Sequence, residues 1–425
     1  MQAVILAAGE SSRFWPLNYR HKTLTRILGR PLISFLVQDL KLAGIKDIVI
    51  VQDGARSIEK ELADKSLRYA IQEEPTGTGD AILAAEKLVR DRQFFVLNAD
   101  DTDVKENIKV IKREFRRGKS KAVLLASRTK TPHLFGILKT RGKKVLEVIE
   151  KPKPGREPSN LKNDNFFLFS RDFFDYLKRV SSHPFSLIYA LNLYAKENPV
   201  AAVISKKETM SLKLPWDLLP ILEAKLNSPD FKTKIAKSVK VARNVIIEGK
   251  VFIGDGVTIG ENSIIKGPCF IGDRCQIRAN NFLQGPLNLE EDLIIRSFSE
   301  LKNCIIERGN HIHRCYLSDS IIGENCRLGA GFISANRRID RDNIYSTVKG
   351  VKIDTGLTRF GVIMGNNTRF GINVGTMPGV FVGSNCLIGP GSVIFENMPD
   401  NTKIITKFQT QILKSRKQLR GNHKG

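Results

Sequence analysis

Aliphatic residues recur at every sixth position from Val241 to Leu301. The uninterrupted series is Val241, Ile247, Ile253, Ile259, Ile265, Ile271, Ile277, Leu283, Leu289, Ile295 and Leu301. A helix repeats about every 3.6 residues and a strand every two, so neither produces this period. A coil with six residues per face does, because each aliphatic side chain then stacks on the one three faces earlier. The period therefore predicts a solenoid with a continuous apolar core.

The same period returns further along the chain. It continues as Tyr316, Ile322, Leu328 and Ser334, and then as Met364, Phe370, Thr376, Val382, Ile388 and Ile394. Thirty residues separate Ser334 from Met364, which is a multiple of six. We therefore expect Ala335–Gly361 to be a loop that leaves the coil and rejoins it in phase.

This pattern resembles the hexapeptide-repeat acyltransferases, which form a left-handed parallel β-helix. The expected hand comes only from the resemblance, because crossovers between parallel strands are ordinarily right-handed. In that family three copies associate, with the active sites between neighbours. The resemblance thus implies a homotrimer.

Length and composition fit a globular protein with two or three domains: the chain has 425 residues, 41% hydrophobic and 26% charged. No apolar run approaches the length of a membrane span, so we expect no membrane partner. Met1–Ala8 runs straight into an apolar strand without a basic start, so no secretory signal is evident. The six cysteines lack C-x-x-C spacing, which argues against zinc or disulfides and favours a cytoplasmic location.

The formal net charge of +24 has three interpretations. It fits an enzyme of phosphorylated substrates, a nucleic-acid-binding protein, or simply a solvated basic surface. The basic residues are spread along the chain, so we do not expect a nucleic-acid partner. The one cluster lies in a basic tail after Thr406, which contains no acidic residue.

The first half begins with a strand-like Val4-Ile5-Leu6 that runs into Ala7-Ala8-Gly9-Glu10-Ser11. Small residues at a strand end let backbone N–H groups approach phosphate oxygens. Arg13 and Lys22 could supply cations beside them. Apolar segments with strand-like and helical spacing then alternate, which predicts an α/β domain with a mostly parallel, Rossmann-like sheet.

Three further segments carry polar groups suited to a nucleotide and a sugar. Gln72 precedes a glycine-rich turn, Gly77-Thr78-Gly79, and its amide could read a base edge. Asp100 follows an apolar strand, where an open α/β sheet binds ligands and Mg²⁺. Glu150, in Glu-Lys-Pro, offers a carboxylate to sugar hydroxyls.

In order and spacing, these segments resemble the sugar-1-phosphate nucleotidylyltransferases over about residues 1–222. The resemblance implies that Arg13 and Lys22 are catalytic and that Asp100 holds Mg²⁺. It assigns nucleotide binding to Leu6, Ala7, Ala8, Gly9, Gln72, Gly77 and Thr78, with UTP or dTTP as the donor. It assigns the sugar 1-phosphate to Gly136, Glu150 and Asn163.

Several positions depart from the family pattern. Ser11 replaces the second glycine of the phosphate loop, Ala99 a glycine before Asp100, and Asn165 the glycine of N-x-G. Ser211 stands where archaeal-type two-domain members have a second metal-binding Asp, five residues before Trp216. Losing that carboxylate would weaken Mg²⁺ binding, although triphosphate and water can also supply oxygens.

The predicted boundaries follow from these patterns. They are a nucleotidyltransferase domain at 1–225, a linker at 226–240, a β-helix acyltransferase domain at 241–405, and the basic tail at 406–425.

Within the coil, the segment from His313 to Gly323 resembles the H-L-x-Y-x-G-D-x-x-I-G segment of the glucosamine-1-phosphate acetyltransferases. The resemblance makes His313 the general base toward the attacking amine, a role for which an imidazole pKa is well placed. Tyr316 would position the acceptor or the thioester. His311 is the nearest competitor, but alternation along a strand would point it to another face.

Leu328-Gly329-Ala330-Gly331 resembles the L-G-A-G of the same family. The resemblance assigns the donor, acetyl-CoA, to Ala330, Asn336, Ile372 and Pro390. It assigns the phosphorylated acceptor to Arg278, Lys302 and Arg327. Arg327 is a departure, because it stands where the family has an acceptor-binding Asn, and its larger charged side chain could narrow or retune the pocket.

End to end, the chain resembles the archaeal-type bifunctional enzymes that make UDP-N-acetylglucosamine from glucosamine-1-phosphate. We therefore expect acetyl transfer followed by uridylyl transfer. One alternative is a glucose-1-phosphate thymidylyl- or uridylyltransferase whose β-helix is only structural, which Arg327 favours. Another is a non-catalytic regulator that binds a nucleotide sugar, which Ser211 favours.

Overall fold

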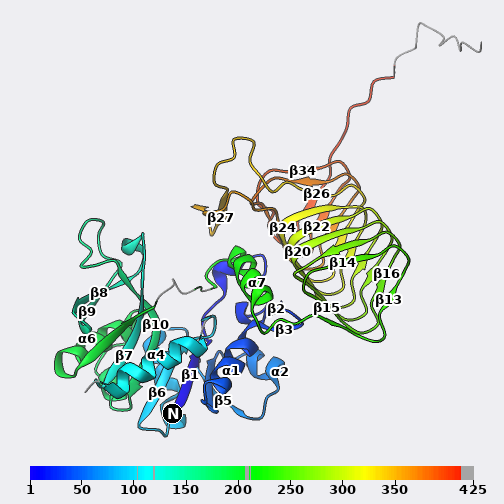
Figure 1. The fold of residues 1–425 in the computed structure, drawn as a ribbon. Coiled ribbons are helices and arrows are strands. Elements are labelled where there is room, and N and C mark those ends of the chain that lie inside the picture. Colours follow the sequence, from blue (N-terminus) through cyan, green and yellow to red (C-terminus); the bar gives the residue numbers. More distant parts are fainter. Residues whose placement is uncertain (103, 118–119, 206–209, 211, 413–425) are drawn as a thin grey trace, which may run out of the picture.

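The structure is a computed structural model that describes residues 1–102, 104–117, 120–205, 210 and 212–412. An α/β lobe contains the first half of the chain, and a tall coil of short strands contains the second half (Figure 1). Helix α7 (Leu218–Asn227) lies between the two. Ser211, on which the metal prediction turned, lies outside the described residues.

The lobe is built on a nine-stranded sheet with the order β5-β4-β1-β6-β10-β7-β11-β9-β8. Its strands are β1 (Gln2–Leu6), β4 (Asp47–Gln52), β5 (Leu67–Ile71), β6 (Gln93–Asn98), β7 (Ala122–Arg128), β8 (Gly136–Arg141), β9 (Lys144–Glu150), β10 (Leu161–Ser170) and β11 (Val200–Ile204). The expected parallel pairing joins β1 to β4 and β6, β4 to β5, and β7 to β11. β10 runs antiparallel between β6 and β7, and β8 and β9 form a hairpin.

Helices cover both faces of this sheet because its central strands are apolar on both sides, as expected for buried parallel strands. α1, α2 and α4 pack on the face that presents Ile5 and Leu97, and α3, α5 and α6 pack on the face that presents Val4 and Val96. The helices are α1 (Leu32–Leu42), α2 (Ser57–Leu62), α3 (Thr78–Ala84), α4 (Val104–Arg117), α5 (Phe173–Lys178) and α6 (Ser186–Glu197). Short 3-10 turns are η1 (Ser12–Phe14), η2 (Lys22–Leu24), η3 (Glu86–Leu88), η4 (Pro132–Leu134) and η5 (Pro215–Asp217), and β2 (Arg26–Ile27) pairs with β3 (Arg30–Pro31).

The coil is a parallel β-helix with three faces. The first face contains β13 (Lys240–Val241), β16 (Thr258–Ile259), β19 (Gln276–Ile277), β21 (Ile294–Ile295), β23 (His311–Ile312), β25 (Arg327–Leu328), β30 (Arg369–Phe370), β33 (Leu387–Ile388) and β35 (Lys403–Ile404). The second and third faces form one sheet because β20 (Phe282–Leu289), β22 (Glu300–Ile306) and β24 (Tyr316–Ile322) run through both. The second face adds β14 (Ile246–Glu248), β17 (Ile264–Lys266), β26 (Ile333–Ser334), β31 (Gly375–Thr376) and β34 (Val393–Ile394). The third face adds β12 (Lys234–Ile235), β15 (Val251–Ile253), β18 (Cys269–Ile271), β29 (Ile363–Met364) and β32 (Phe381–Val382).

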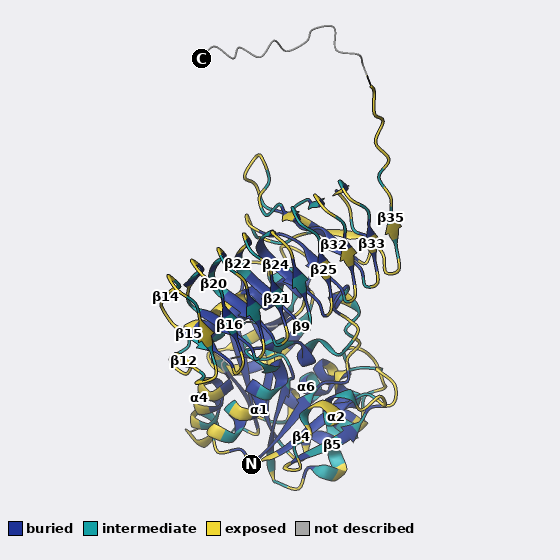
Figure 2. Ribbon diagram, turned by 90° about the vertical axis from the view of Figure 1, so that its right-hand side faces the viewer, coloured by how far each residue is buried: buried dark blue, intermediate teal, exposed yellow. Residues whose placement is uncertain are grey.

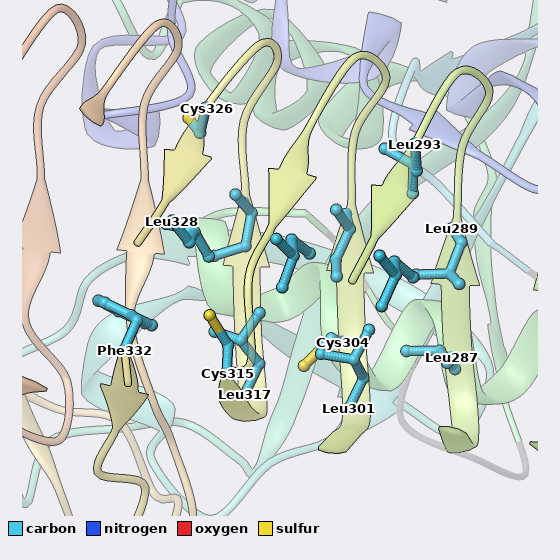
Figure 3. Packing of buried hydrophobic residues seen from close by; sticks show 14 of the residues in the cluster. Leu287, Leu289, Leu293, Leu301, Cys304, Cys315, Leu317, Cys326, Leu328 and Phe332 are labelled. Carbon is cyan, nitrogen blue, oxygen red and sulfur yellow. The ribbon is translucent and has the colours of Figure 1, made fainter. Parts of the chain in front are cut away.

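The predicted stacking of aliphatic residues is confirmed. Val241 pairs with Ile259, and Ile259 with Ile277, each 18 residues on. From Ile253 onward the residues of the series are buried in one continuous core, part of which is shown in Figure 3, whereas Val241 at the first turn is 48% exposed. All six cysteines of the chain lie in the described part of the coil, buried and free, and burial raises the pKa of Cys304 and Cys326 to about 12.

One position in the period was wrong. Leu317, not Tyr316, pairs with Leu301 and points into the core, whereas Tyr316 pairs with Glu300 on the outside. The reason is that successive coils shorten here: Ile295 pairs with Ile312 and Ile312 with Leu328, and these pairs are only 17 and then 16 residues apart. The shift leaves the Tyr316 ring on the outer surface of the second face.

The loop predicted at Ala335–Gly361 is confirmed, since Ile322 pairs with Met364 when the chain returns. It contains a hairpin of β27 (Tyr345–Val348) and β28 (Val351–Asp354). Its residues Ile344, Val348 and Phe360 are buried in a cluster shared by the two halves of the molecule.

The lobe packs directly against the third face of the coil (Figure 2). The shared cluster includes Phe14 and Trp216 from the lobe side and Ile305, Ile321 and Phe381 from the coil. The predicted linker, 226–240, is therefore wrong in part: it holds the end of α7 and the first strand, β12, which already pairs with β15. Ile235 stands six residues before Val241, so the apolar period extends one step further back than the series given above, and its side chain is 46% exposed at the end of the coil. Residues 406–412 of the basic tail contain no helix or strand, and 413–425 lie outside the described residues.

Candidate functional site

The first group of predicted residues lies at the carboxyl ends of β1 and β6. The Lys22 ammonium donates to Asp100 Oδ2 at 2.8 Å and to the Leu212 carbonyl at 2.5 Å. The Leu212 N–H donates to the same Asp100 oxygen at 3.1 Å. Asp100 is thus held by its neighbours through one oxygen.

The phosphate loop between these strand ends is open. Leu6 and Ala7 bond to the neighbouring strands through their backbones, and Ala8 is buried behind them. A side chain on Gly9 would meet no described atom within 4 Å, which leaves room for a ligand beside the loop. Ser11, a departure from the expected glycine, accepts a hydrogen bond from the Lys22 N–H at 2.9 Å and so ties the loop to the lysine.

The residues predicted to hold the base lie together on the loop before α3. Gln72 Nε2 donates to the Gly77 carbonyl at 3.0 Å, and Thr78 begins the helix. A Cβ at Gly77 would lie 2.4 Å from the His183 carbonyl, so the turn packs too closely on that backbone for any larger residue.

The residues predicted for the sugar lie on the hairpin and on β10. Gly136 pairs with Glu150, and a Cβ there would lie 2.4 Å from a Glu150 carboxylate oxygen. Burial raises the pKa of Glu150. Asn163 and Asn165 hydrogen-bond to each other, and Asn165 has a φ of 56°, a conformation that asparagine tolerates in place of the family's glycine.

The second group of residues lies on the coil, at the corner between the first and second faces. His313 directly follows Ile312, and Arg278 directly follows Ile277, which belongs to the same ladder two coils earlier. Ala330, Ile372 and Pro390 occupy a single corner position on three successive coils, each two residues after a paired core residue. His313 is exposed, and its backbone N–H donates to the Leu328 carbonyl at 3.1 Å, so the residue borders the Gly329-Ala330 turn.

Tyr316 extends from the start of the second face, next to this corner, and Lys302 extends from the other end of that face, beside the turn into the third face. Asn336 is bound more firmly, since its amide donates to Asp319 Oδ2 at 2.6 Å and to Ser318 Oγ at 3.1 Å. Within one chain, Arg327 lies apart from the residues at this corner. It stands on the outside of the first face, between His311 and Arg369. His311 also lies on the outside of the first face, where it pairs with Arg327. The argument from strand alternation was wrong, because residues two apart on a strand point to the same side. His311 and His313 differ instead because β23 ends at Ile312 and His313 lies in the turn that follows.

Two family models match the sequence. The model described as nucleotidyl transferase matches residues 2–212, and the model described as hexapeptide repeat of succinyl-transferase matches residues 250–284 and 361–396. A bifunctional sugar-1-phosphate nucleotidylyltransferase/acetyltransferase of Sulfurisphaera tokodaii is 32% identical over 406 residues, which are 93% of this chain and 97% of the relative. Relatives named bifunctional protein GlmU are 33% identical in Methanocaldococcus jannaschii, over 95% of this chain and 97% of theirs, and 34% identical in Methanococcus maripaludis strain C7, over 98% and 100%.

The chain belongs to the bifunctional sugar-1-phosphate nucleotidylyltransferase/acetyltransferase family. It is an enzyme with a nucleotidyltransferase domain followed by hexapeptide acyltransferase repeats. Within the described ranges, no helix is long and apolar enough to cross a membrane.

This member of the bifunctional family carries cations in the lobe that sequence reasoning missed. The Lys213 and Lys162 ammonium groups lie 4.3 and 5.0 Å from the centroid of the Phe135 ring. Desolvation lowers the pKa of Lys213, the charge of Lys162 lowers it further, and Asp100 and Arg13 are among its charged neighbours. The only sequence signals were that Lys162 adjoins Asn163 and that Lys213 lies two residues after the divergent Ser211.

The carboxylates near Lys22 fit a magnesium ion held mainly by its substrate. Asp101 is half-buried, and one of its carboxylate oxygens accepts the Asn98 N–H. Desolvation and the neighbouring Asp100 raise its pKa, which disfavours the ionised form that a magnesium ion would need. Asp100 therefore supplies one carboxylate, which suits Mg²⁺ because this ion commonly takes one or two protein carboxylates along with phosphate and water oxygens. Among the described side chains there is no group of three or more His, Cys, Asp or Glu that could hold a metal ion by itself.

Proposed function

We propose that the chain makes UDP-N-acetylglucosamine in two steps. The coil transfers acetyl from acetyl-CoA to glucosamine-1-phosphate. The lobe then transfers uridylyl from UTP to N-acetylglucosamine-1-phosphate and releases pyrophosphate. The observation that carries the proposal is that one chain holds two separate groups of residues suited to these two reactions. The chain is also similar, over nearly the full length of both sequences, to relatives named as bifunctional.

In the lobe, a phosphate oxygen of the sugar attacks the α-phosphorus of the nucleotide, and the bond to the bridging oxygen breaks as pyrophosphate leaves. Arg13 and Lys22 bind the triphosphate and stabilise the charge on the leaving group, with Lys213 nearby. Asp100 is the residue that would hold Mg²⁺, which when bound neutralises phosphate charge. Catalysis of this kind is mainly positioning and electrostatics.

The remaining lobe residues select the substrates. Leu6, Ala7, Ala8 and Gly9 line the phosphates with backbone and small side chains. Gln72, Gly77 and Thr78 hold the base, and a single glutamine amide accommodates uracil or thymine, so dTTP is the alternative donor. Gly136, Glu150 and Asn163 hold the sugar, with Glu150 accepting from hydroxyl groups.

On the coil, the acceptor's amine nitrogen attacks the thioester carbonyl and His313 takes the amine proton. The carbon–sulfur bond then breaks, and the coenzyme leaves as a thiol after protonation. His313 can do this because its ring is exposed at a corner beside the Gly329-Ala330 turn. Tyr316, Arg278, Lys302 and Arg327 bind the acceptor, and Ala330, Asn336, Ile372 and Pro390 bind acetyl-CoA.

We also propose that the coil forms a homotrimer that completes this second site. Support comes from large apolar side chains left open on the second face and its corners: Phe298 is 65% exposed, Ile333 53%, Ile372 57%, Val393 52% and Phe395 69%. A run of exposed apolar groups on one side is typical of an interface. Light scattering at working concentration tests this state.

Two assays on the whole protein test the proposed reactions. The first follows coenzyme release from acetyl-CoA with glucosamine-, galactosamine- or glucose-1-phosphate. The second follows pyrophosphate release from UTP or dTTP with Mg²⁺ and the corresponding sugar phosphates. Activity in the second alone would indicate a structural coil, and silence in both together with nucleotide-sugar binding would indicate a regulator.

A further inference from the structure

The segment of residues 14–21, which joins Arg13 to Lys22, lies on the coil. Phe14 and Leu17 are 1% exposed in the cluster shared with the third face. The Trp15 ring lies 6.1 Å from that of Phe381, and its Nε1 donates to Asp400 Oδ1 at 3.2 Å. The start of the segment is therefore docked on the late turns of the β-helix.

The end of the 14–21 segment is held by buried acids on the earlier turns. The Tyr19 hydroxyl donates to Glu307 Oε2 at 2.7 Å, and the Arg20 guanidinium forms an ion pair with the same oxygen. Arg20 also lies 3.2 Å from Glu324 and donates to the Tyr19 hydroxyl at 2.8 Å. The Glu307 side chain is only 2% exposed, so this contact is made inside the interface.

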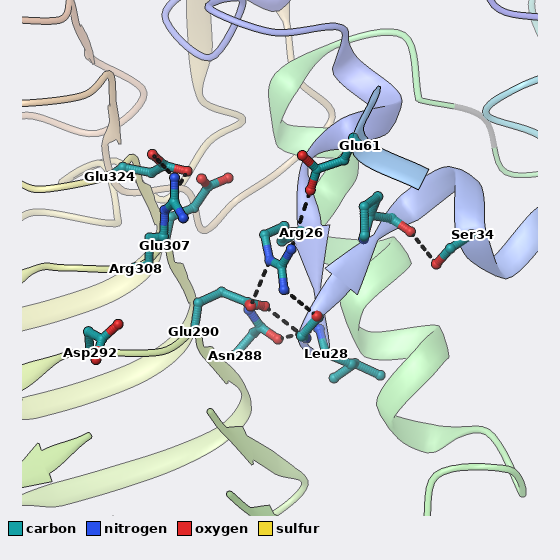
Figure 4. A network of polar contacts seen from close by, with 12 residues as sticks. Arg26, Leu28, Ser34, Glu61, Asn288, Glu290, Asp292, Glu307, Arg308 and Glu324 are labelled. Atoms are coloured by element: carbon teal, nitrogen blue, oxygen red, sulfur yellow. Dashed lines mark hydrogen bonds and ion pairs between the residues drawn. The ribbon is translucent and has the colours of Figure 1, made fainter. Parts of the chain in front are cut away.

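These acids form a row along the edge of the coil that faces the lobe. Figure 4 shows Glu290, Glu307 and Glu324 on successive turns, with Arg26 of the lobe reaching Glu290. The Leu28 and Gly29 N–H groups donate to Asn288 and Glu290 at 2.8 and 3.1 Å. The coil thus also holds the residues that follow η2.

Short contacts link the docked residues to the predicted transfer site. His21, next to Arg20, is hydrogen-bonded through its ring to the backbone of Gly9 and to Thr23 Oγ1, the latter at 2.8 Å. The Lys22 N–H bonds to Ser11, and its ammonium bonds to Asp100. His21 and Lys22 are the two residues that follow Arg20, so a displacement of Arg20 would move both the phosphate loop and the Lys22 ammonium.

We propose that Glu307 of the coil is a positioning residue for nucleotidyl transfer: by holding Tyr19 and Arg20 it fixes the segment that places Arg13 and Lys22. This inference rests on the proposed function of the lobe. Its physical basis is that a reacting group misplaced by about 1 Å can cost about a hundredfold in rate, so the contacts that hold a catalytic loop matter as much as the loop itself.

The test compares full-length variants in the pyrophosphate-release assay with UTP, N-acetylglucosamine-1-phosphate and Mg²⁺. Glu307→Gln keeps the shape of the side chain but removes its charge, and we expect kcat to fall about tenfold or more with a smaller change in KM. Arg20→Gln should have a similar effect. The double variant should add little to either, because both changes remove one interaction.

The matched control is Asp292→Asn. Asp292 forms an ion pair with Arg274 on the neighbouring turn of the β-helix, but its side chain is 49% exposed. It lies away from the lobe in Figure 4. It should leave kcat within about twofold of wild type, because exposed pairs contribute little. Acetyl transfer should stay unchanged in all four variants.

A pH profile separates positioning from mere structural support. Burial raises the pKa of Glu307 to about 7, with Glu324 and Glu290 raising it and Arg20 and Tyr19 lowering it. Wild-type pyrophosphate release should therefore decline as the pH falls through about 7, and Glu307→Gln should lack this decline.

Three outcomes would overturn the positioning role. Glu307→Gln could keep the wild-type kcat and pH profile. Its pyrophosphate release, acetyl transfer and cooperative melting could all fall together, which would show a structural contribution alone. A wild-type enzyme that releases no pyrophosphate would overturn the proposed function of the lobe as well, whereas the first two outcomes leave it standing.

Discussion

The two sites differ in how much of each is completed by a single chain. In the lobe, Lys22 is already paired with Asp100, and the Gly77 turn is packed against the backbone at His183. On the coil, His313, Ile372 and Arg327 lie exposed on the outside. The predicted lobe residues thus contact one another within one chain, while the predicted coil residues stand on its open outer surface.

The architecture explains this difference. An open α/β sheet leaves a crevice beyond the carboxyl ends of its strands, and loops from several strands can converge there. A β-helix has no such space, because its interior is filled by stacked apolar side chains from Val251 onward. Functional groups on a coil must therefore stand on its outer faces, where the proposed homotrimer would let a second copy enclose the substrate.

The largest expected effect breaks the coil site alone. His313→Ala should lower acetyl transfer by about 10²- to 10⁴-fold, because it removes the general base. Pyrophosphate release should not change. His311→Ala is the matched control: it removes an imidazole two residues away on the first face, and it should keep most of the activity. If His311→Ala were the inactive variant, the assignment of the base would move to the first face.

The converse variant breaks the lobe site alone. Lys22→Met should reduce pyrophosphate release by about 10²- to 10³-fold, since it removes a charge aimed at the phosphates. Acetyl transfer serves as the internal reference and should be unaffected. Lys41→Met is the control, because Lys41 makes a similar 2.8 Å pair with Asp64 at the surface. Equal losses in the two lysine variants would contradict a catalytic role for Lys22.

The sequence could predict the coil well because a period of six has few structural solutions. Residues of the series such as Val241, Ile259 and Ile277 pair in register, as the period predicted. It placed Tyr316 in the core because counting back six from Ile322 lands on this aromatic residue. The core residue is its neighbour Leu317, only five residues before Ile322. In the lobe, motif order located Lys22 and Asp100. Lys213 and Glu307 were missed because their roles depend on contacts between segments far apart in the chain.

The pH dependence of stability tests the contact between the two halves. Since the pKa of Glu307 is about 7 in the folded protein and about 4.5 when unfolded, the native state keeps a proton that the unfolded chain has lost between these values. This group's contribution is therefore present below about pH 4.5 and is lost as the pH rises through 7, a change on the order of 3 kcal/mol. Urea unfolding from pH 4.5 to 8 should show this decline in wild type and a flatter profile in Glu307→Gln. Asp292 has the opposite sign, because its hydrogen bond to Arg274 lowers its pKa from the ordinary value of 3.8. Its contribution is lost only below about pH 4, outside this window, so Asp292→Asn should keep the wild-type slope from pH 4.5 to 8.

The smallest expected effect concerns the lysine near Asp100 that the motifs did not reveal. Lys213→Met should raise the KM for the nucleotide or the sugar phosphate about tenfold and change kcat less, because one more cation near the phosphates mainly strengthens binding. Desolvation and Lys162 lower the pKa of Lys213, so this lysine loses its charge at a lower pH than an ordinary lysine does. The wild-type KM should therefore begin to rise at a correspondingly lower alkaline pH. Lys139→Met, on the exposed side of β8, is the control and should leave both constants unchanged.

Steady-state kinetics from pH 7 to 10 measures these effects. A Lys213→Met enzyme with the wild-type KM at every pH would restrict the cationic site to Arg13, Lys22 and Lys162.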